Sequence, residues 1–174
     1  LLGLGAVPGS WINSSQDLSL GSSGTVSHVI AISVDGLRPG DIDELGADEL
    51  PNLFRFRNEG AFTDNARTDY FITRTLPNHS SMLTGRGSLD VTGVGIGHNQ
   101  EMNHDSGDTL HDNIGAYMHG IFDVAKDAGL RTALFANKSK FNLLNRTWDG
   151  SWKDSGGDNN TPAPRITTFS VLDH

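Results

Sequence analysis

The stretch NIGAYMHGIFDVAKDAGLRTALFA, residues 113–136, decides the fold of this chain. In its first part, apolar side chains recur at intervals of three and four residues, as on one face of a helix. These residues are Ile114, Met118, Ile121, Phe122, Ala125 and Ala128. Because Gly129 is typical of a helix end, the pattern predicts a helix over 113–129. The run LRTALFA then predicts a buried strand over 130–136, and a helix that leads into a buried strand indicates an α/β fold.

Segments on both sides of this stretch alternate in the same way. HVIAISV is a short apolar run rich in β-branched residues, which predicts a buried strand over 28–34. A helix is expected over 50–61, with Pro51 in its first turn, Gly60 as its C-cap, and Leu53, Phe54 and Phe56 toward the core. Further elements are expected as helices over 77–83 and 139–145 and as a strand-like run over 166–174. The alternation predicts a mainly parallel sheet with helices on both faces.

Composition limits the classes of function. The 174 residues carry a net charge of −8, which argues against a nucleic acid or an anionic membrane as partner because either requires a basic surface. The chain has no cysteine, so disulfides, thiolate metal sites and cysteine nucleophiles are excluded. No run approaches the roughly 20 apolar residues that a transmembrane helix needs.

The two ends differ from the middle. Residues 1–27 combine an apolar start, LLGLGAVPGS, with a Ser/Gly-rich linker, and the start is either the remnant of a secretory signal peptide or a frayed terminus. A signal remnant would place the protein in the periplasm or outside the cell. We expect the folded domain to cover residues 28–174. Because an α/β domain seldom ends on a strand, we expect the chain to be a fragment that is incomplete at its C-terminus.

Two residues stand where parallel α/β folds place their chemistry. Asp35 follows the first predicted strand and precedes Gly36, so it is either a metal ligand at the carboxyl end of a strand or the Asp of a common Asp-Gly turn. Thr75 comes two residues before Pro77, which suits the first turn of a helix. A Thr at or just before the N-cap is either a cap or a nucleophile at a site that attracts phosphate. The local sequence does not decide between the two roles of Asp35 or between the two roles of Thr75.

Other polar residues admit both structural and functional interpretations. His79 could serve as an acid or ligand, although a His one turn into a helix more commonly bonds locally. Asn99 lies in a glycine-rich loop and could offer its amide to an anion or simply form a turn. The spacing of His98, His104, His111 and His119 fits no helical ligand pair, which favours local roles. For the pair at 173–174, Asp-His, we also favour a structural role.

Four blocks together resemble one family: HVIAISVDGLRP (28–39), LPNLFRFRNEGAFTDNARTD (50–69), TRTLPNHSSMLTGR (73–86) and FDVAKDAGLRTALFANKSKF (122–141). They look like the N-terminal part of type I phosphodiesterase/nucleotide pyrophosphatase proteins of the alkaline phosphatase superfamily, over residues 28–149. The resemblance implies a three-layer αβα fold with two divalent metal ions, zinc in this family.

The resemblance also assigns roles. It implies that Asp35 is a metal ligand and that Thr75 is the nucleophile and contacts a metal. It compares Asn99 with the Asn that holds a phosphoryl oxygen, although Thr92 stands where that motif has a His and the spacing is stretched. The family's remaining ligands come from a later part of the domain.

The implied reaction is hydrolysis of phosphodiester or nucleotide pyrophosphate bonds through a phosphothreonine, with a small phosphate ester or nucleotide as substrate. Two alternatives remain open: a phosphomonoesterase of the same superfamily, and a non-catalytic binding module on a degenerate fold. A sulfatase is disfavoured, because that branch uses a distinct Cys or Ser motif that RTLPNH does not match.

Overall fold

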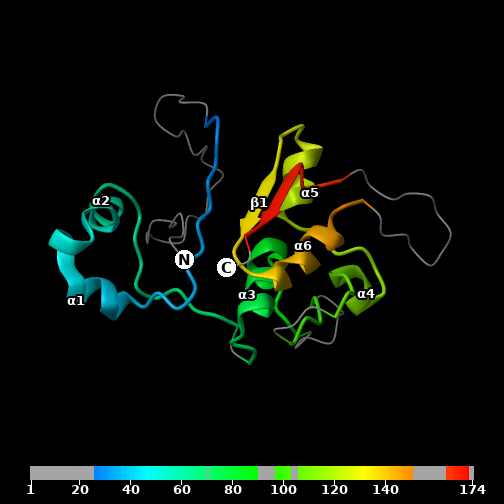
Figure 1. The fold of residues 1–174 in the computed structure, drawn as a ribbon, viewed down its shortest axis with the longest axis horizontal. Helices are drawn as coiled ribbons and strands as arrows, with labels where there is room; N and C mark the ends of the chain where they lie inside the picture. The colour runs from blue at the N-terminus through cyan, green and yellow to red at the C-terminus, as the bar shows by residue number, and fades with distance from the viewer. Residues whose placement is uncertain (1–25, 70, 90–96, 103–105, 151–163, 173–174) are drawn as a thin grey trace, which may run out of the picture. The chain divides into compact units, whose positions relative to one another are not determined.

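The computed structural model describes residues 26–69, 71–89, 97–102, 106–150 and 164–172 (Figure 1). It divides into two units, residues 1–66 and 67–174, each of which is described by itself below. None of the helices within these described ranges has the length and apolar character needed to cross a lipid bilayer.

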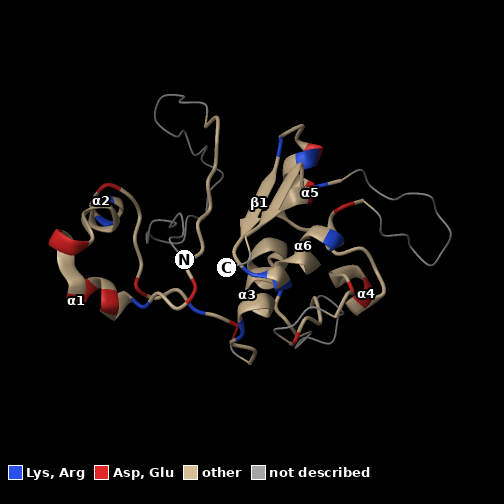
Figure 2. Ribbon diagram, viewed as in Figure 1, with Lys and Arg blue, Asp and Glu red and all other residues tan. Residues whose placement is uncertain are grey.

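The first unit contains two consecutive helices, α1 (Pro39–Glu49) and α2 (Pro51–Glu59). The predicted helix over 50–61 is confirmed as α2, with Pro51 at its start and Gly60 as its C-cap. No helix was predicted at α1, which begins three residues after the turn at 35–36. Phe56 was expected to face the core but is 62% exposed, and no residue of α2 is fully buried. In Figure 2, the red stretches of the α1 ribbon mark its Asp and Glu residues.

The strand predicted over 28–34 is wrong in this structure. These residues form no strand, and Val29, Ile30 and Ile32 are all more than 60% exposed. A strand exists only through hydrogen bonds to a neighbouring strand. Within the described ranges, the sheet has two strands, which pair with each other, and residues 28–34 pair with neither of them.

The second unit contains a parallel pair of strands. β1 (Ala133–Ala136) pairs with β2 (Thr168–Val171), and the register places Leu134 opposite Phe169. Both strands lie inside the ranges predicted for them and are shorter. The chain is therefore of the α/β class with a small parallel sheet, whereas the complete three-layer arrangement stays a prediction.

The helix predicted over 113–129 is two helices, α4 (Leu110–Ile114) and α5 (Ile121–Asp127). Gly115 ends α4 in the left-handed conformation at φ 67°, and Gly120 is the N-cap of α5. The Asp123 carboxylate accepts the Gly120 N–H at 2.7 Å and so fixes the new helix start. The single-helix prediction is wrong because the apolar period continues across a break that these local bonds impose.

The remaining helices surround the core of the second unit. A 3₁₀ turn, η1 (Ser139–Phe141), continues into α6 (Asn142–Thr147), which confirms the short helix predicted over 139–145. The helix α3 (Thr75–Thr84) buries Leu76, Pro77 and Ser80. The core is one cluster of buried apolar side chains from these helices and from the segments that connect them: Leu76, Leu110, Met118, Phe122, Phe141, Leu143, Leu144, Trp148 and Ile166.

Candidate active site

Thr75 is the first residue of α3, and the helix that was predicted from Pro77 therefore starts two residues earlier. Arg74 is the N-cap, with an extended backbone and no capping bond from its side chain. Thr75 is half-buried, at the end of the helix where the macrodipole is positive. The expectation that Thr75 lies at a helix start is thus confirmed, one position further into the helix than a cap.

Asn78 locks the backbone that leads into Thr75. Its Nδ2 donates to the carbonyls of Arg74 at 2.7 Å and Ile72 at 2.8 Å. The Arg74 carbonyl belongs to the peptide unit that joins Arg74 to Thr75, so this bond fixes the orientation of that unit. The Asn78 Oδ1 accepts the backbone N–H of Asp69 at 2.6 Å. One side chain of α3 therefore holds three points of the preceding turn.

Asp69 holds the same turn from the other side. Its Oδ1 accepts the N–H groups of Phe71 at 2.9 Å and Ile72 at 3.2 Å. Its Oδ2 accepts the Ser88 N–H at 3.0 Å. These bonds lower the pKa of Asp69, with the Ser88 N–H as the largest cause and partial burial opposing it. Sequence reasoning assigned no role to Asp69 or Asn78, although Asp two residues before a turn amide is a common Asx pattern.

His79 anchors the first turn of α3 locally. Its Nδ1 lies 2.7 Å from the Thr75 carbonyl, which can only accept, so Nδ1 carries the proton. The ring meets Phe141 edge to face, with centroids 4.9 Å apart. This local bonding agrees with the commoner of the two interpretations drawn from the sequence.

His98 is fully buried and ties the segment 97–100 to α3. Its Nδ1 accepts the Gln100 N–H at 3.0 Å, so Nε2 carries the proton and donates to Ser81 Oγ at 3.0 Å. Burial lowers the pKa of His98 to about 4, which keeps the imidazole neutral. With its accepting nitrogen already occupied, His98 is a structural link and cannot act as a general base toward Ser81.

Asn99 lies beside this link, and its backbone has φ 54°, a left-handed conformation that Asn tolerates better than most residues. Its side chain is exposed, and Nδ2 donates to the Asn113 carbonyl at 3.3 Å. Its N–H donates to the Ser88 carbonyl at 2.8 Å. Asn99 and Thr75 are thus connected through Ser88, Asp69 and Asn78. Thr92 lies outside the described residues.

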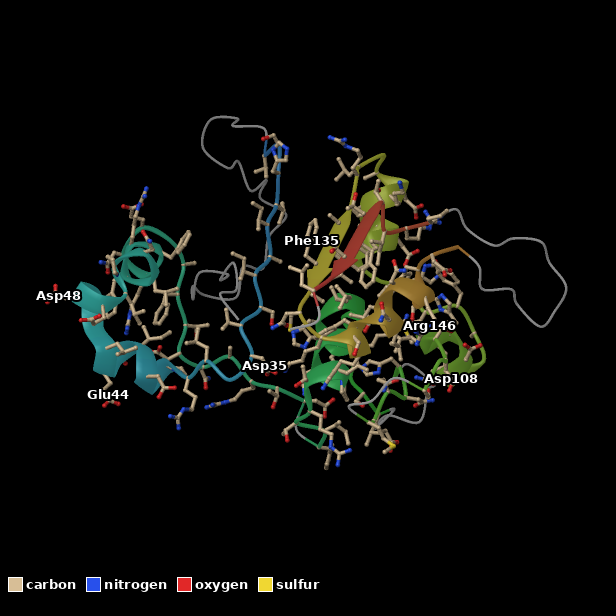
Figure 3. All side chains as sticks on the ribbon, viewed as in Figure 1. Asp35, Glu44, Asp48, Asp108, Phe135 and Arg146 are labelled. Carbon is tan, nitrogen blue, oxygen red and sulfur yellow. The ribbon has the colours of Figure 1, made fainter. Side chains whose placement is uncertain are left out.

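Asp35 belongs to the first unit, where it forms a turn with Gly36 at φ 76° and is exposed (Figure 3). Thr75 belongs to the second unit. Their carboxylate and hydroxyl oxygens suit a divalent ion. Within the described ranges, however, no group of three or more His, Asp or Glu could hold a metal ion, so these two donors do not make a complete site.

The other histidines in the described part of the chain have local partners. His111 is buried, accepts the Met118 N–H at 2.8 Å through Nδ1 and stacks on Tyr117. His119 meets the edge of the same tyrosine ring. These contacts agree with the local roles that the sequence favoured over a metal cluster. His104 and the pair at 173–174 lie outside the described residues.

Comparison with known proteins places the chain in a family. Residues 29–160 match the family described as type I phosphodiesterase / nucleotide pyrophosphatase. A bis(5'-adenosyl)-triphosphatase of Mus musculus, enpp4, is 36% identical over 64 residues, which is 37% of this chain and 13% of that protein. No solved structure matches the chain. Because the family match covers most of the sequence, the chain belongs to the type I phosphodiesterase/nucleotide pyrophosphatase family.

Proposed function

We propose that the full-length protein hydrolyses phosphodiester or nucleotide pyrophosphate bonds through a phosphothreonine at Thr75. The observation that carries the proposal is the position of Thr75 at the start of α3 in a chain of this family. The match spans only 13% of the murine relative, whose name describes a bis(5'-adenosyl)-triphosphatase. A small phosphate ester or nucleotide is accordingly the proposed substrate class.

In the first step, the Thr75 oxygen bonds to phosphorus as the bond from phosphorus to the leaving oxygen breaks, and the Thr75 proton passes through solvent to the departing alcohol or nucleotide. In the second step, a water oxygen bonds to the phosphorus of the phosphothreonine as the bond from phosphorus to the Thr75 oxygen breaks. One water proton restores the Thr75 hydroxyl, and the other stays with the phosphate product. The positive end of α3 favours negative charge on the phosphoryl oxygens throughout. Divalent metal ions, zinc in our proposal, would supply Lewis-acid stabilisation there, with Asp35 and Thr75 among their oxygen ligands.

Asn99 is our candidate for a second contact to a phosphoryl oxygen. Its side chain is exposed, and its left-handed backbone conformation is of the kind that tends to occur at functional sites. The only side-chain bond that we describe for it, to the Asn113 carbonyl, is long. An amide in this role would act as a donor to developing negative charge.

The test is hydrolysis of a chromogenic phosphodiester by the full-length protein. We expect Thr75→Ala to lower kcat by at least about 1,000-fold, because it removes the attacking oxygen. Thr73→Ala is the matched control, since Thr73 is an exposed threonine two residues away, and it should retain activity. Turnover by Thr75→Ala would refute the nucleophile assignment.

The same assay tests the neighbouring assignments. Asn99→Gly removes the amide and still permits φ 54°, so a phosphoryl contact predicts a loss of about 100-fold or more in kcat. Wild-type kcat would remove Asn99 from the site. Rates on a matched monoester and diester separate the proposed activity from a phosphomonoesterase, and absence of turnover on both would favour a binding module.

We further propose that residues 28–174 form the N-terminal part of a three-layer αβα catalytic domain of the alkaline-phosphatase type. The start of the family match at residue 29 supports this boundary. The apolar residues 1–10 support export to the periplasm or the medium. Mass spectrometry of the mature N-terminus, after expression of the full gene, would refute export if residues 1–10 and any preceding leader were retained in the cytoplasm.

A further inference from the structure

We propose that Asp69 is a positioning residue for Thr75 in the reaction proposed above, on which this inference rests. Asp69 touches no reacting atom in this assignment. It acts by fixing the turn that delivers Thr75 to the start of α3 and by joining that turn to the segment that carries Asn99.

Four hydrogen bonds to backbone N–H groups and to Asn78 meet at Asp69. The Asp69 carboxylate accepts three backbone N–H groups, from Phe71, Ile72 and Ser88. Its own N–H is accepted by the Asn78 side chain on α3. A carboxylate that accepts several N–H groups is strongly favoured in its ionised form, and such charge-assisted bonds are stronger than neutral ones. The Asp69 carboxylate is therefore held in place by several hydrogen bonds and is a poor proton acceptor at neutral pH.

Asn78 connects Asp69 to the backbone just before Thr75. Asn78 bonds both Asp69 and the Arg74 carbonyl, which forms part of the peptide unit that precedes Thr75. Ile72 is held from both sides, through its N–H by Asp69 and through its carbonyl by Asn78. Without the carboxylate, Asn78 alone would hold the turn.

Ser88 connects Asp69 to the segment that carries Asn99. Ser88, whose N–H donates to Asp69, is fully buried and donates through Oγ to the Gln100 carbonyl at 2.6 Å. The Ser88 carbonyl accepts the Asn99 N–H. Asp69 thus joins the turn before Thr75, through Ser88, to the segment 97–100. Its loss should change the position of Thr75 relative to a bound phosphoryl group.

The experiment uses the full-length protein and the variant Asp69→Asn. The amide keeps one oxygen but places a donor where the other oxygen accepts an N–H, so at least one set of bonds is lost. Misplacement of a reacting group by about 1 Å can cost 100-fold. We therefore expect kcat to fall roughly 10- to 100-fold while KM changes less than about threefold. Asp108→Asn is the matched control, because Asp108 is exposed and its carboxylate accepts from the nearby Ser106 hydroxyl.

Hydrogen exchange measured by mass spectrometry supplies a readout that general destabilisation would not reproduce. Faster exchange in Asp69→Asn should be confined to the amides of Phe71, Ile72 and Ser88 and their immediate neighbours. A uniform loss of protection across residues 67–174, or an unfolded variant, would make Asp69 a stability residue and overturn the proposal.

The kinetic outcomes separate this inference from the proposed function. An active wild type with unchanged kcat in Asp69→Asn refutes the positioning role alone. A wild type that hydrolyses no phosphate ester refutes the proposed function, and the positioning role falls with it. Loss of kcat with local exchange only is the expected result.

Discussion

At the scale of single residues, His98 is a fully buried titratable side chain of the second unit. Its pKa is lowered to about 4 by burial, against about 6.5 in an unfolded chain. Between these two values the unfolded chain binds more protons than the folded one, so the free energy of unfolding rises with pH. The stabilisation that comes from neutral His98 is fully present above about pH 6.5 and is lost progressively as the pH falls toward 4.

We predict that replacing His98 by Gln removes most of this pH dependence. The difference between the two pKa values corresponds to roughly 3 kcal/mol at most. Denaturant unfolding of the wild type and His98→Gln between pH 4 and 7 measures it. The variant is expected to be less stable at pH 7, because its bonds to Ser81 and Gln100 change, but to show a flatter slope. Parallel slopes would contradict the assigned protonation state.

Part of the candidate site was predictable at this scale and part was not. Thr75 could be found because Pro77 marks a helix start only two residues away. The connection of Asp69 to the segment that carries Asn99 could not be found, because it runs through Ser88, which is 19 residues distant in sequence. Hydrogen bonds of that separation depend on how the chain folds back, which residue type and local spacing do not encode.

At the scale of elements, the break between α4 and α5 depends on packing around Gly120. The N-cap glycine lies against the indole of Trp148, and a Cβ at this position would come within 2.6 Å of that ring and 3.0 Å of the Leu83 carbonyl. Trp148 cannot move easily, because it is fully buried and its Nε1 donates to the Met118 carbonyl. The sequence predicted one helix here because the apolar period does not record this close approach.

Gly120→Ala is therefore expected to destabilise the protein by about 1–3 kcal/mol through overpacking. The matched control is Gly87→Ala in the same unit, where an added Cβ would meet its nearest neighbour, Asp69 Oδ2, at an ordinary 3.5 Å. Its effect should stay within about 0.5 kcal/mol. Denaturant midpoints of the two variants compare them directly, and equal midpoints would show that the indole yields to the new methyl group.

A second set of contacts joins α5 to a residue just before β2, and local patterns did not predict this connection. Arg165, which lies three residues before β2, pairs with Asp127 on α5 at 2.7 Å and with the buried Asp123 at 3.3 Å. Tyr117 donates to Asp123 at 2.8 Å, and burial is the largest cause that raises the pKa of this tyrosine above its usual range. Each element has its own local pattern, whereas the ion pairs between them join residues about 40 positions apart.

At the scale of the whole molecule, local patterns predicted the class of the fold better than its sheet. The parallel pair of β1 and β2 follows from two apolar runs that both became strands. The run at 28–34 is also apolar and is rich in β-branched residues, yet it forms no strand in the described structure. Composition shows that a segment is suited to a buried strand, but a strand also needs a neighbour, and pairing over more than 100 residues is a property of the complete fold. On β1 itself, Phe135 is 70% exposed (Figure 3).

The proposed metal ions concern the whole molecule, because their candidate ligands Asp35 and Thr75 come from different units. The described residues supply these two candidate donors and no group of three His, Asp or Glu that could hold a metal ion, so the prediction is made for the full-length protein. Chelation should then abolish hydrolysis by that protein, and added zinc should restore it. Asp35→Asn should raise the zinc concentration needed for half-maximal recovery by about 10-fold or more, as the loss of a ligand does. Asp48→Asn, an exposed change on α1 in the same unit, should leave that concentration unchanged. Activity that survives exhaustive chelation would exclude the metal from the mechanism, whereas equal zinc requirements for both variants would exclude only Asp35.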